Sequence, residues 1–102
     1  MGTVALELEA MRAGAAQACR LARVLSNPNR LMILCQLSLG EKRVGELEEV
    51  LGIVQPTLSQ QLTVLREDEL VATRREGKSI YYALASPQAL AVIKVLYKQF
   101  CV

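Results

Sequence analysis

The sequence contains no histidine and no tryptophan, and its aromatic residues are limited to three tyrosines and one phenylalanine. Without histidine, the chain lacks the side chain that most often serves as a general base and as a nitrogen ligand of metal ions. It also lacks a Cys-x-x-Cys pair and a glycine-rich phosphate loop, so an enzyme is not expected. With so few aromatic rings, the hydrophobic core has to consist of Leu, Val, Ile and Ala, which suits packed helices.

Cysteine is also scarce, and the chain has no long apolar run. The three cysteines, Cys19, Cys35 and Cys101, are an odd number, which argues against the disulfide framework of a small secreted protein. No apolar stretch approaches the roughly 18 residues that a membrane span requires, and the segment from Met1 to Met11 lacks the layout of a signal peptide. These absences predict a cytoplasmic protein, without a membrane segment, in which thiols start reduced.

The length and composition predict one globular domain covering residues 1–102. The chain is 52% hydrophobic and 22% charged, as in a folded protein with one modest core. Its net charge of +2 is too small to indicate a nucleic-acid partner, so the distribution of charge has to decide that question.

Apolar residues that recur every three or four positions predict five helices. Two of these helices have clear starts, because Asn27 can cap a helix that begins at Pro28, and Ser86-Pro87 has the same form. The predicted ranges are 4–25, 28–39, 44–51, 55–67 and 87–101, with Gly40 and Gly52 closing the second and third helices. Between the last two helices, β-rich segments at 70–75 and 79–84 flank Gly77, which predicts a tight hairpin.

This order of elements is typical of a winged helix-turn-helix, a mainly α fold of five helices with a two-stranded β-hairpin wing. The fourth helix suits base reading, since its inner face is apolar and its outer face is polar without charge. Glutamine can pair with adenine, while Ser and Thr serve either base type. The predicted base contacts are Gln55, Thr57, Ser59, Gln60, Gln61 and Thr63.

The tip of the hairpin suits contacts with DNA phosphates, since its basic residues outnumber the single Glu76. The predicted phosphate contacts are Arg74, Arg75 and Lys78. Together with the polar helix, they predict double-stranded DNA as the partner.

The last helix is apolar on more than one side, which predicts a homodimer. Leu90, Ile93 and Tyr97 form one stripe, and Val92 and Val95 widen it. A helix this apolar has to be buried on two faces, while a chain of this size covers only one. A second copy offering its own first and last helices would give a twofold interface, and a twofold dimer reads an inverted repeat.

Several motifs in combination resemble the ArsR/SmtB family of bacterial repressors. They are Leu25-Ser-Asn-Pro-Asn-Arg-Leu-Met-Ile-Leu34, Val44-Gly-Glu-Leu, Gln55-Pro-Thr-Leu-Ser-Gln-Gln-Leu62, Val64-Leu-Arg66 and Arg74-Arg-Glu-Gly-Lys-Ser-Ile-Tyr-Tyr82. The resemblance implies a dimeric winged helix, with its first and last helices at the interface, that binds operator DNA until an inducer releases it. One departure is Val54, where many relatives have a serine, since a valine side chain cannot cap the following helix.

The family usually senses metals, but the ligand patterns of its metal sensors are missing. The segment 44–51 has no Cys-x-Cys, and the segment 87–101 has no Asp or His, so no metal site and no cofactor are expected. The placement of Cys35 and Cys101 instead resembles the BigR-like subgroup, whose dithiol responds to reactive sulfur species and oxidants. The resemblance therefore implies that bridging these two thiols releases DNA, while Cys19 is expected to be a small buried hydrophobe.

Three other functions stay open. The same scaffold suits a repressor that responds to arsenite or another thiophilic metal through Cys35 and Cys101. A small thiol oxidoreductase is disfavoured by the missing catalytic motifs. A protein-interaction module with a degenerate helix-turn-helix is disfavoured by the intact polar face of residues 55–63.

Overall fold

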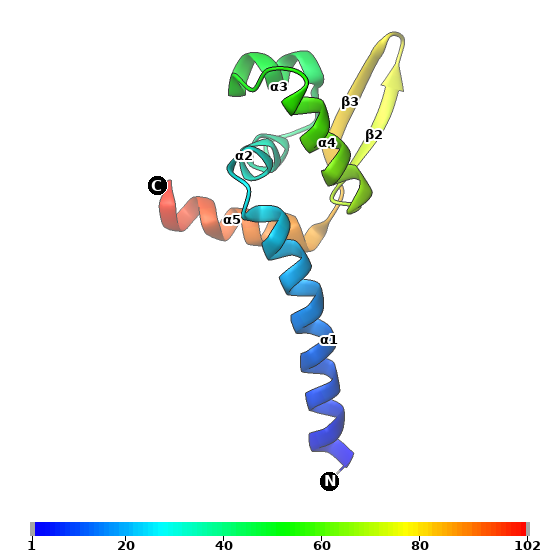
Figure 1. Cartoon of the computed structure of the whole chain (residues 1–102), viewed down its shortest axis with the longest axis vertical. Coiled ribbons are helices and arrows are strands. Elements are labelled where there is room, and N and C mark those ends of the chain that lie inside the picture. Colours follow the sequence, from blue (N-terminus) through cyan, green and yellow to red (C-terminus); the bar gives the residue numbers. More distant parts are fainter. Residues whose placement is uncertain (1, 102) are drawn as a thin grey trace.

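The computed structural model describes residues 2–101 and has the winged helix arrangement that the sequence predicts (Figure 1). Its elements are α1 (Gly2–Leu25), α2 (Pro28–Leu37), β1 (Lys42–Arg43), α3 (Val44–Leu51), α4 (Thr57–Glu67), β2 (Val71–Glu76), β3 (Ser79–Leu84) and α5 (Pro87–Phe100). The prediction of a mainly helical fold with five helices and a hairpin wing is confirmed. A third short strand, β1, joins the two predicted strands.

The helix starts follow from side-chain caps. The Asn27 side chain accepts a hydrogen bond from the Arg30 N–H at 3.1 Å, and Ser86 accepts one from the Ala89 N–H at 3.1 Å. In each case a proline occupies the first turn, where its missing N–H costs no helical hydrogen bond. Both predicted starts are confirmed.

Three predicted helix boundaries are wrong by about two residues. Helix α1 begins at Gly2 rather than residue 4. Helix α2 ends at Leu37 rather than residue 39, because Ser38 caps it and donates its hydroxyl to the Cys35 carbonyl at 2.6 Å. Helix α4 begins at Thr57 rather than Gln55, since Pro56 is its N-cap residue.

The wing is an antiparallel sheet with strand order β1-β3-β2. Glu76 pairs with Ser79 across a two-residue turn, in which Gly77 has the positive φ of 62° that favours glycine. On the other side of β3, Lys42 pairs with Tyr82, so the wing is fastened to the chain segment just before α3.

The core lies where α2, α3, α4 and α5 meet, and aliphatic side chains fill it. Helix α4 supplies Leu58, Leu62 and Leu65, which are almost completely buried, as predicted. From α2 come Ile33 and Leu34, which are fully buried. Burial of this inner face fixes the rotation of α4 and leaves its polar residues on the outside.

Helix α1 projects from this body, and Figure 1 shows its N-terminal half away from the other elements. Its apolar side chains Val4, Leu6 and Met11 are 60–68% exposed, and Phe100 at the end of α5 is 82% exposed. None of the helices described between residues 2 and 101 has the length and apolarity needed to cross a membrane.

Candidate DNA-binding surface and thiol pair

The polar surface of α4 is presented by a helix-turn-helix formed with α3. Gly52 ends α3 in a left-handed conformation, with φ of 68°, and its N–H donates to the Glu48 carbonyl at 2.9 Å. Ile53 then enters the core and anchors the turn. The two helices are therefore held at a defined angle, with the polar face of α4 pointing outward.

Gln55, which was predicted as a base contact, precedes the N-cap Pro56, and its side chain binds the first turn of α4 in the free protein. Its Oε1 atom accepts a hydrogen bond from the Ser59 N–H at 3.2 Å and another from the Ser59 hydroxyl. Its Nε2 atom donates to a Glu48 carboxylate oxygen at 2.8 Å. The Gln55 side chain thus pairs an N–H in the first turn of α4, which the N-cap Pro56 has no side-chain acceptor to do, and it ties α3 to α4.

The other predicted base contacts differ in how freely their side chains project. Thr63 donates its hydroxyl to the Ser59 carbonyl at 2.9 Å, and Thr57 is half-buried. Gln60 is exposed, and its side chain has no hydrogen bond to any other residue of the part that the structure describes. Gln60 is therefore the glutamine on α4 best placed to meet a base.

Gln61 turns toward the protein instead. It is half-buried, and its Oε1 atom accepts a hydrogen bond from Nη1 of Arg30 at 3.3 Å. Arg30 lies on α2, 31 positions earlier in the chain. The sequence reasoning missed this residue because its proximity to α4 comes from tertiary packing.

Arg74 on the wing is held by two carboxylates. Its Nε atom donates to Glu41 at 2.9 Å, its Nη1 atom donates to Glu76 at 2.7 Å, and its guanidinium lies 4.4 Å from the centre of the Tyr81 ring. The hydrogen bond from Arg74 lowers the pKa of Glu41, and the two carboxylates raise the pKa of Arg74. Two carboxylates thus partly offset the charge of this arginine, which was not predicted.

Arg75 and Lys78 are in a different situation. Both are exposed, and neither forms an ion pair with a carboxylate among residues 2–101. Their charges are therefore available to an approaching polyanion, in contrast to the charge of Arg74.

The structure brings Cys35 and Cys101 toward one another, because α2 and α5 are in contact. Cys35 is half-buried against the core, and Cys101 is exposed at the end of α5. Burial raises the pKa of Cys35, and the negative charge of an ionised Cys101 raises it further. Both thiols are free. Cys19 is also free and is exposed on α1, so the prediction that it is buried is wrong for the single chain.

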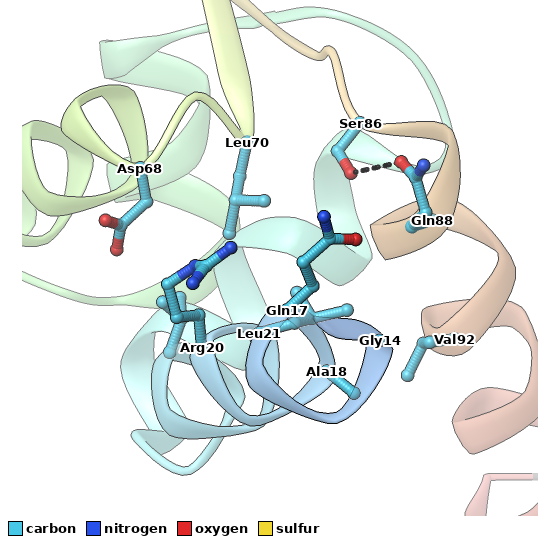
Figure 2. A pocket seen from close by; sticks show the side chains of 11 residues that line it. Gly14, Gln17, Ala18, Arg20, Leu21, Asp68, Leu70, Ser86, Gln88 and Val92 are labelled. Atoms are coloured by element: carbon cyan, nitrogen blue, oxygen red, sulfur yellow. Dashed lines mark hydrogen bonds between the residues drawn. The ribbon is translucent and has the colours of Figure 1, made fainter. Parts of the chain in front are cut away.

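A hollow of about 450 Å³ lies between α1, the α4–β2 connection and the start of α5 (Figure 2). Gln17 and Arg20 of α1 face it from one side, and Asp68 and Val92 from the others.

Within residues 2–101, no three His, Cys, Asp or Glu side chains are grouped so that they could hold a metal ion.

Comparison with known proteins is consistent with this geometry. Residues 27–73 match the family described as "Bacterial regulatory protein, arsR family". The chain is 51% identical to the biofilm growth-associated repressor of Agrobacterium fabrum, over 94% of this chain and 82% of that protein.

Two solved structures are similar over nearly the whole chain. The transcriptional repressor BigR from Xylella fastidiosa has a TM-score of 0.86 at 49% identity, covering 92% of this chain and 96% of that one. Reduced HlyU from Vibrio cholerae, a protein named a transcriptional activator, has a TM-score of 0.87 at 39% identity, covering 92% and 99%.

Proposed function

Since the chain belongs to the ArsR family of bacterial regulatory proteins and is a DNA-binding transcriptional repressor of the BigR type, we propose how it holds and releases DNA. It occupies an inverted-repeat operator in the cytoplasm as a homodimer. It leaves the operator when reactive sulfur species or an oxidant bridge Cys35 and Cys101. The observation that carries this proposal is the placement of these two thiols on helices that contact each other.

The exposed apolar faces of α1 and α5 support the homodimer. Val95 and Tyr97 on α5 are more than half exposed, as are Val4 and Leu6 on α1. Apolar surface of this extent on two helices is typical of an interface. In the proposed dimer, α1 and α5 of one copy cover the same helices of its partner around a twofold axis.

Two groups of side chains support DNA binding. Thr57, Ser59 and Gln60 on α4 are proposed to meet base edges in the major groove. Arg75 and Lys78 on the wing are proposed to contact phosphates, because their charges are unpaired among the described residues. Ser59 donates its hydroxyl to Gln55 in the free protein and exchanges this bond for one to a base in the proposed complex. Of the remaining predicted contacts, Gln55, Gln61, Thr63 and Arg74 also have partners within the chain.

The thiol chemistry follows from the different exposure of the two cysteines. Cys101 is exposed and reacts first, because burial and the nearby Cys101 charge raise the pKa of Cys35 and so disfavour its thiolate. The Cys101 thiolate attacks the sulfane sulfur of a polysulfide, forms a persulfide and releases a shorter sulfide. Cys35 then loses its proton to solvent, its thiolate attacks the inner sulfur of that persulfide, and hydrosulfide leaves. The two thiols are oxidised by two electrons, and the polysulfide is reduced by the same two.

A bridge between these cysteines ties α2 to α5. Helix α2 also contacts α4, and α5 belongs to the proposed interface, so the bridge changes the relative placement of the two α4 helices in the dimer. To change the ratio of occupied to empty operator from 99:1 to 1:99, the bridge has to weaken the free energy of DNA binding by about 5.5 kcal/mol. A covalent bond that is present in only one state can supply this difference through strain.

The test is a mobility-shift assay on an operator obtained by selection from random duplexes. Cys35→Ser and Cys101→Ser proteins should bind DNA normally and stay bound under polysulfide, while the matched control Cys19→Ser should be released like the parent. Intact mass and peptide mapping should show a Cys35–Cys101 link only in the released protein. Release of either sensing variant by polysulfide would contradict the mechanism, and release by arsenite alone would favour the thiophilic-metal alternative.

A further inference from the structure

The guanidinium of Arg30 connects three elements of the protein. Its Nε atom donates to the Val24 carbonyl at 2.9 Å, and its Nη2 atom donates to the Arg23 carbonyl at 3.2 Å. Its Nη1 atom donates to Oε1 of Gln61 at 3.3 Å. Arg30 itself lies on α2 and is half-buried. A single side chain thus joins the end of α1 to the middle of α4.

The carbonyl partners at the end of α1 explain why an arginine suits this position. The last carbonyls of a helix have no partner within the helix, and a cation near this end is favourable for the helix dipole. The planar guanidinium has donors that point in fixed directions, so it can reach both Val24 and Gln61 without rearranging. An ammonium on a flexible stem would hold the two elements less rigidly.

The Gln61 partner is what connects this arrangement to DNA. Gln61 lies on the polar side of α4, next to Gln60, but its side chain is half-buried and engaged with α2. The carbonyls that Arg30 binds end α1, the helix that carries exposed apolar residues along its N-terminal half. Arg30 therefore links α1, which belongs to the proposed dimer interface, to α4, which is proposed to meet the bases.

We infer that Arg30 and Gln61 are positioning residues that fix the orientation of α4 relative to α1, and so set the distance between the two half-sites that a dimer can meet. Gln61 does not read a base. This inference rests on the proposed binding of an inverted repeat by a homodimer. It differs from that proposal in concerning the spacing of the half-sites rather than their sequence.

The inference predicts a specific pattern of affinities. When the bond is removed, each half of the dimer still recognises its own half-site, because Thr57, Ser59 and Gln60 are unchanged. The two α4 helices are held less rigidly, so simultaneous engagement of both half-sites becomes weaker. We expect about tenfold weaker binding to the full operator, equivalent to about 1.4 kcal/mol, and a smaller preference for the natural spacing.

The experiment compares Gln61→Met with Gln60→Ala and the parent protein. Each is titrated against the selected operator, an isolated half-site, and operators whose half-sites are moved by one base pair in either direction. Gln61→Met should keep the half-site affinity and lose much of the spacing preference. Gln60→Ala should weaken the half-site and keep the spacing preference. Gln61→Glu retains an acceptor for Arg30 and should keep the spacing preference, even if its charge lowers every affinity.

Circular dichroism and thermal melting establish that each variant is folded, and light scattering establishes that it is dimeric. If Gln61→Met weakened the half-site and kept the parental spacing preference, Gln61 would be a base-reading residue and the inference would be wrong. A parent protein that bound full operator and half-site equally well would contradict the proposed dimeric binding itself.

Discussion

Replacing Gln55 by alanine should destabilise the protein while leaving its choice of bases unchanged. The Gln55 side chain accepts the Ser59 N–H at 3.2 Å and donates to Glu48 at 2.8 Å. Loss of a helix cap costs about 0.5–2 kcal/mol. Since this cap is exposed and its hydrogen bond is long, the lower half of that range applies. The proposed dimer has two such caps, so its free energy of unfolding should fall by about 1–2.5 kcal/mol.

The assay is urea unfolding at a fixed protein concentration, because the stability of a dimer depends on concentration. With a denaturant dependence of about 2–3 kcal/mol per molar urea, the midpoint should fall by roughly 0.5 M. The matched control is Gln60→Ala, whose side chain is exposed and has no partner among residues 2–101. Its unfolding free energy should stay within about 0.5 kcal/mol of the parent.

Operator binding should show the opposite pattern. Gln60→Ala should lose ~1–3 kcal/mol of discrimination at one base position. Gln55→Ala should weaken all operator sequences alike, because α4 is less well ordered before it binds. If Gln55→Ala kept its stability and lost discrimination at a particular base, Gln55 would be a base contact and the capping argument would be refuted.

Three further predictions concern the wing, the thiols and metal ions. Arg75→Ala should weaken binding to every sequence and reduce the slope of log affinity against log salt by about 0.9 for each phosphate that is no longer neutralised. The control Arg74→Ala should leave this slope unchanged. An equal reduction for both variants would show that Arg74 also binds phosphate. Because burial and a nearby Cys101 charge raise the pKa of Cys35, alkylation of Cys35 followed by mass spectrometry should accelerate only above the ordinary thiol pKa of about 8.5. In Cys101→Ser this acceleration should move to lower pH, and an unchanged profile would mean that the two thiols do not interact. Zinc should bind the reduced protein no more tightly than micromolar in a competition assay with a chromogenic chelator, because the sequence offers no histidine; submicromolar affinity would contradict this expectation.

The elements of the fold could be predicted because their determinants are local. The Asn27-Pro28 start of α2 depends on neighbouring residues, as does the turn at Gly77. The inward face of α4 follows from a repeat of leucines alone. Strand β1 was missed because two residues carry no pattern of their own, and Lys42 becomes a strand residue only by pairing with Tyr82.

The roles of individual polar side chains were harder to predict, because tertiary contacts decide them. Gln60 and Gln61 are adjacent and chemically identical, yet only Gln61 lies within reach of Arg30. Arg74 and Arg75 point to opposite faces of a strand, and only Arg74 meets Glu41, which is 33 positions away. The sequence placed all four residues in one candidate surface. Tertiary packing shows that Gln61 and Arg74 bind other side chains of the protein, while Gln60 and Arg75 are exposed.

Helix α2 contacts α1, α3, α4, α5 and β3, and it carries both Arg30 and Cys35. In the proposed mechanism, a chemical change at Cys35 therefore occurs on the element that contacts α4 and both helices of the proposed interface. In that mechanism, the signal passes through the packing of α2 itself. This arrangement also makes α2 intolerant of variation. In a scan of all single substitutions, its inward positions should accept fewer replacements than those of α1, even though α1 is more than twice as long.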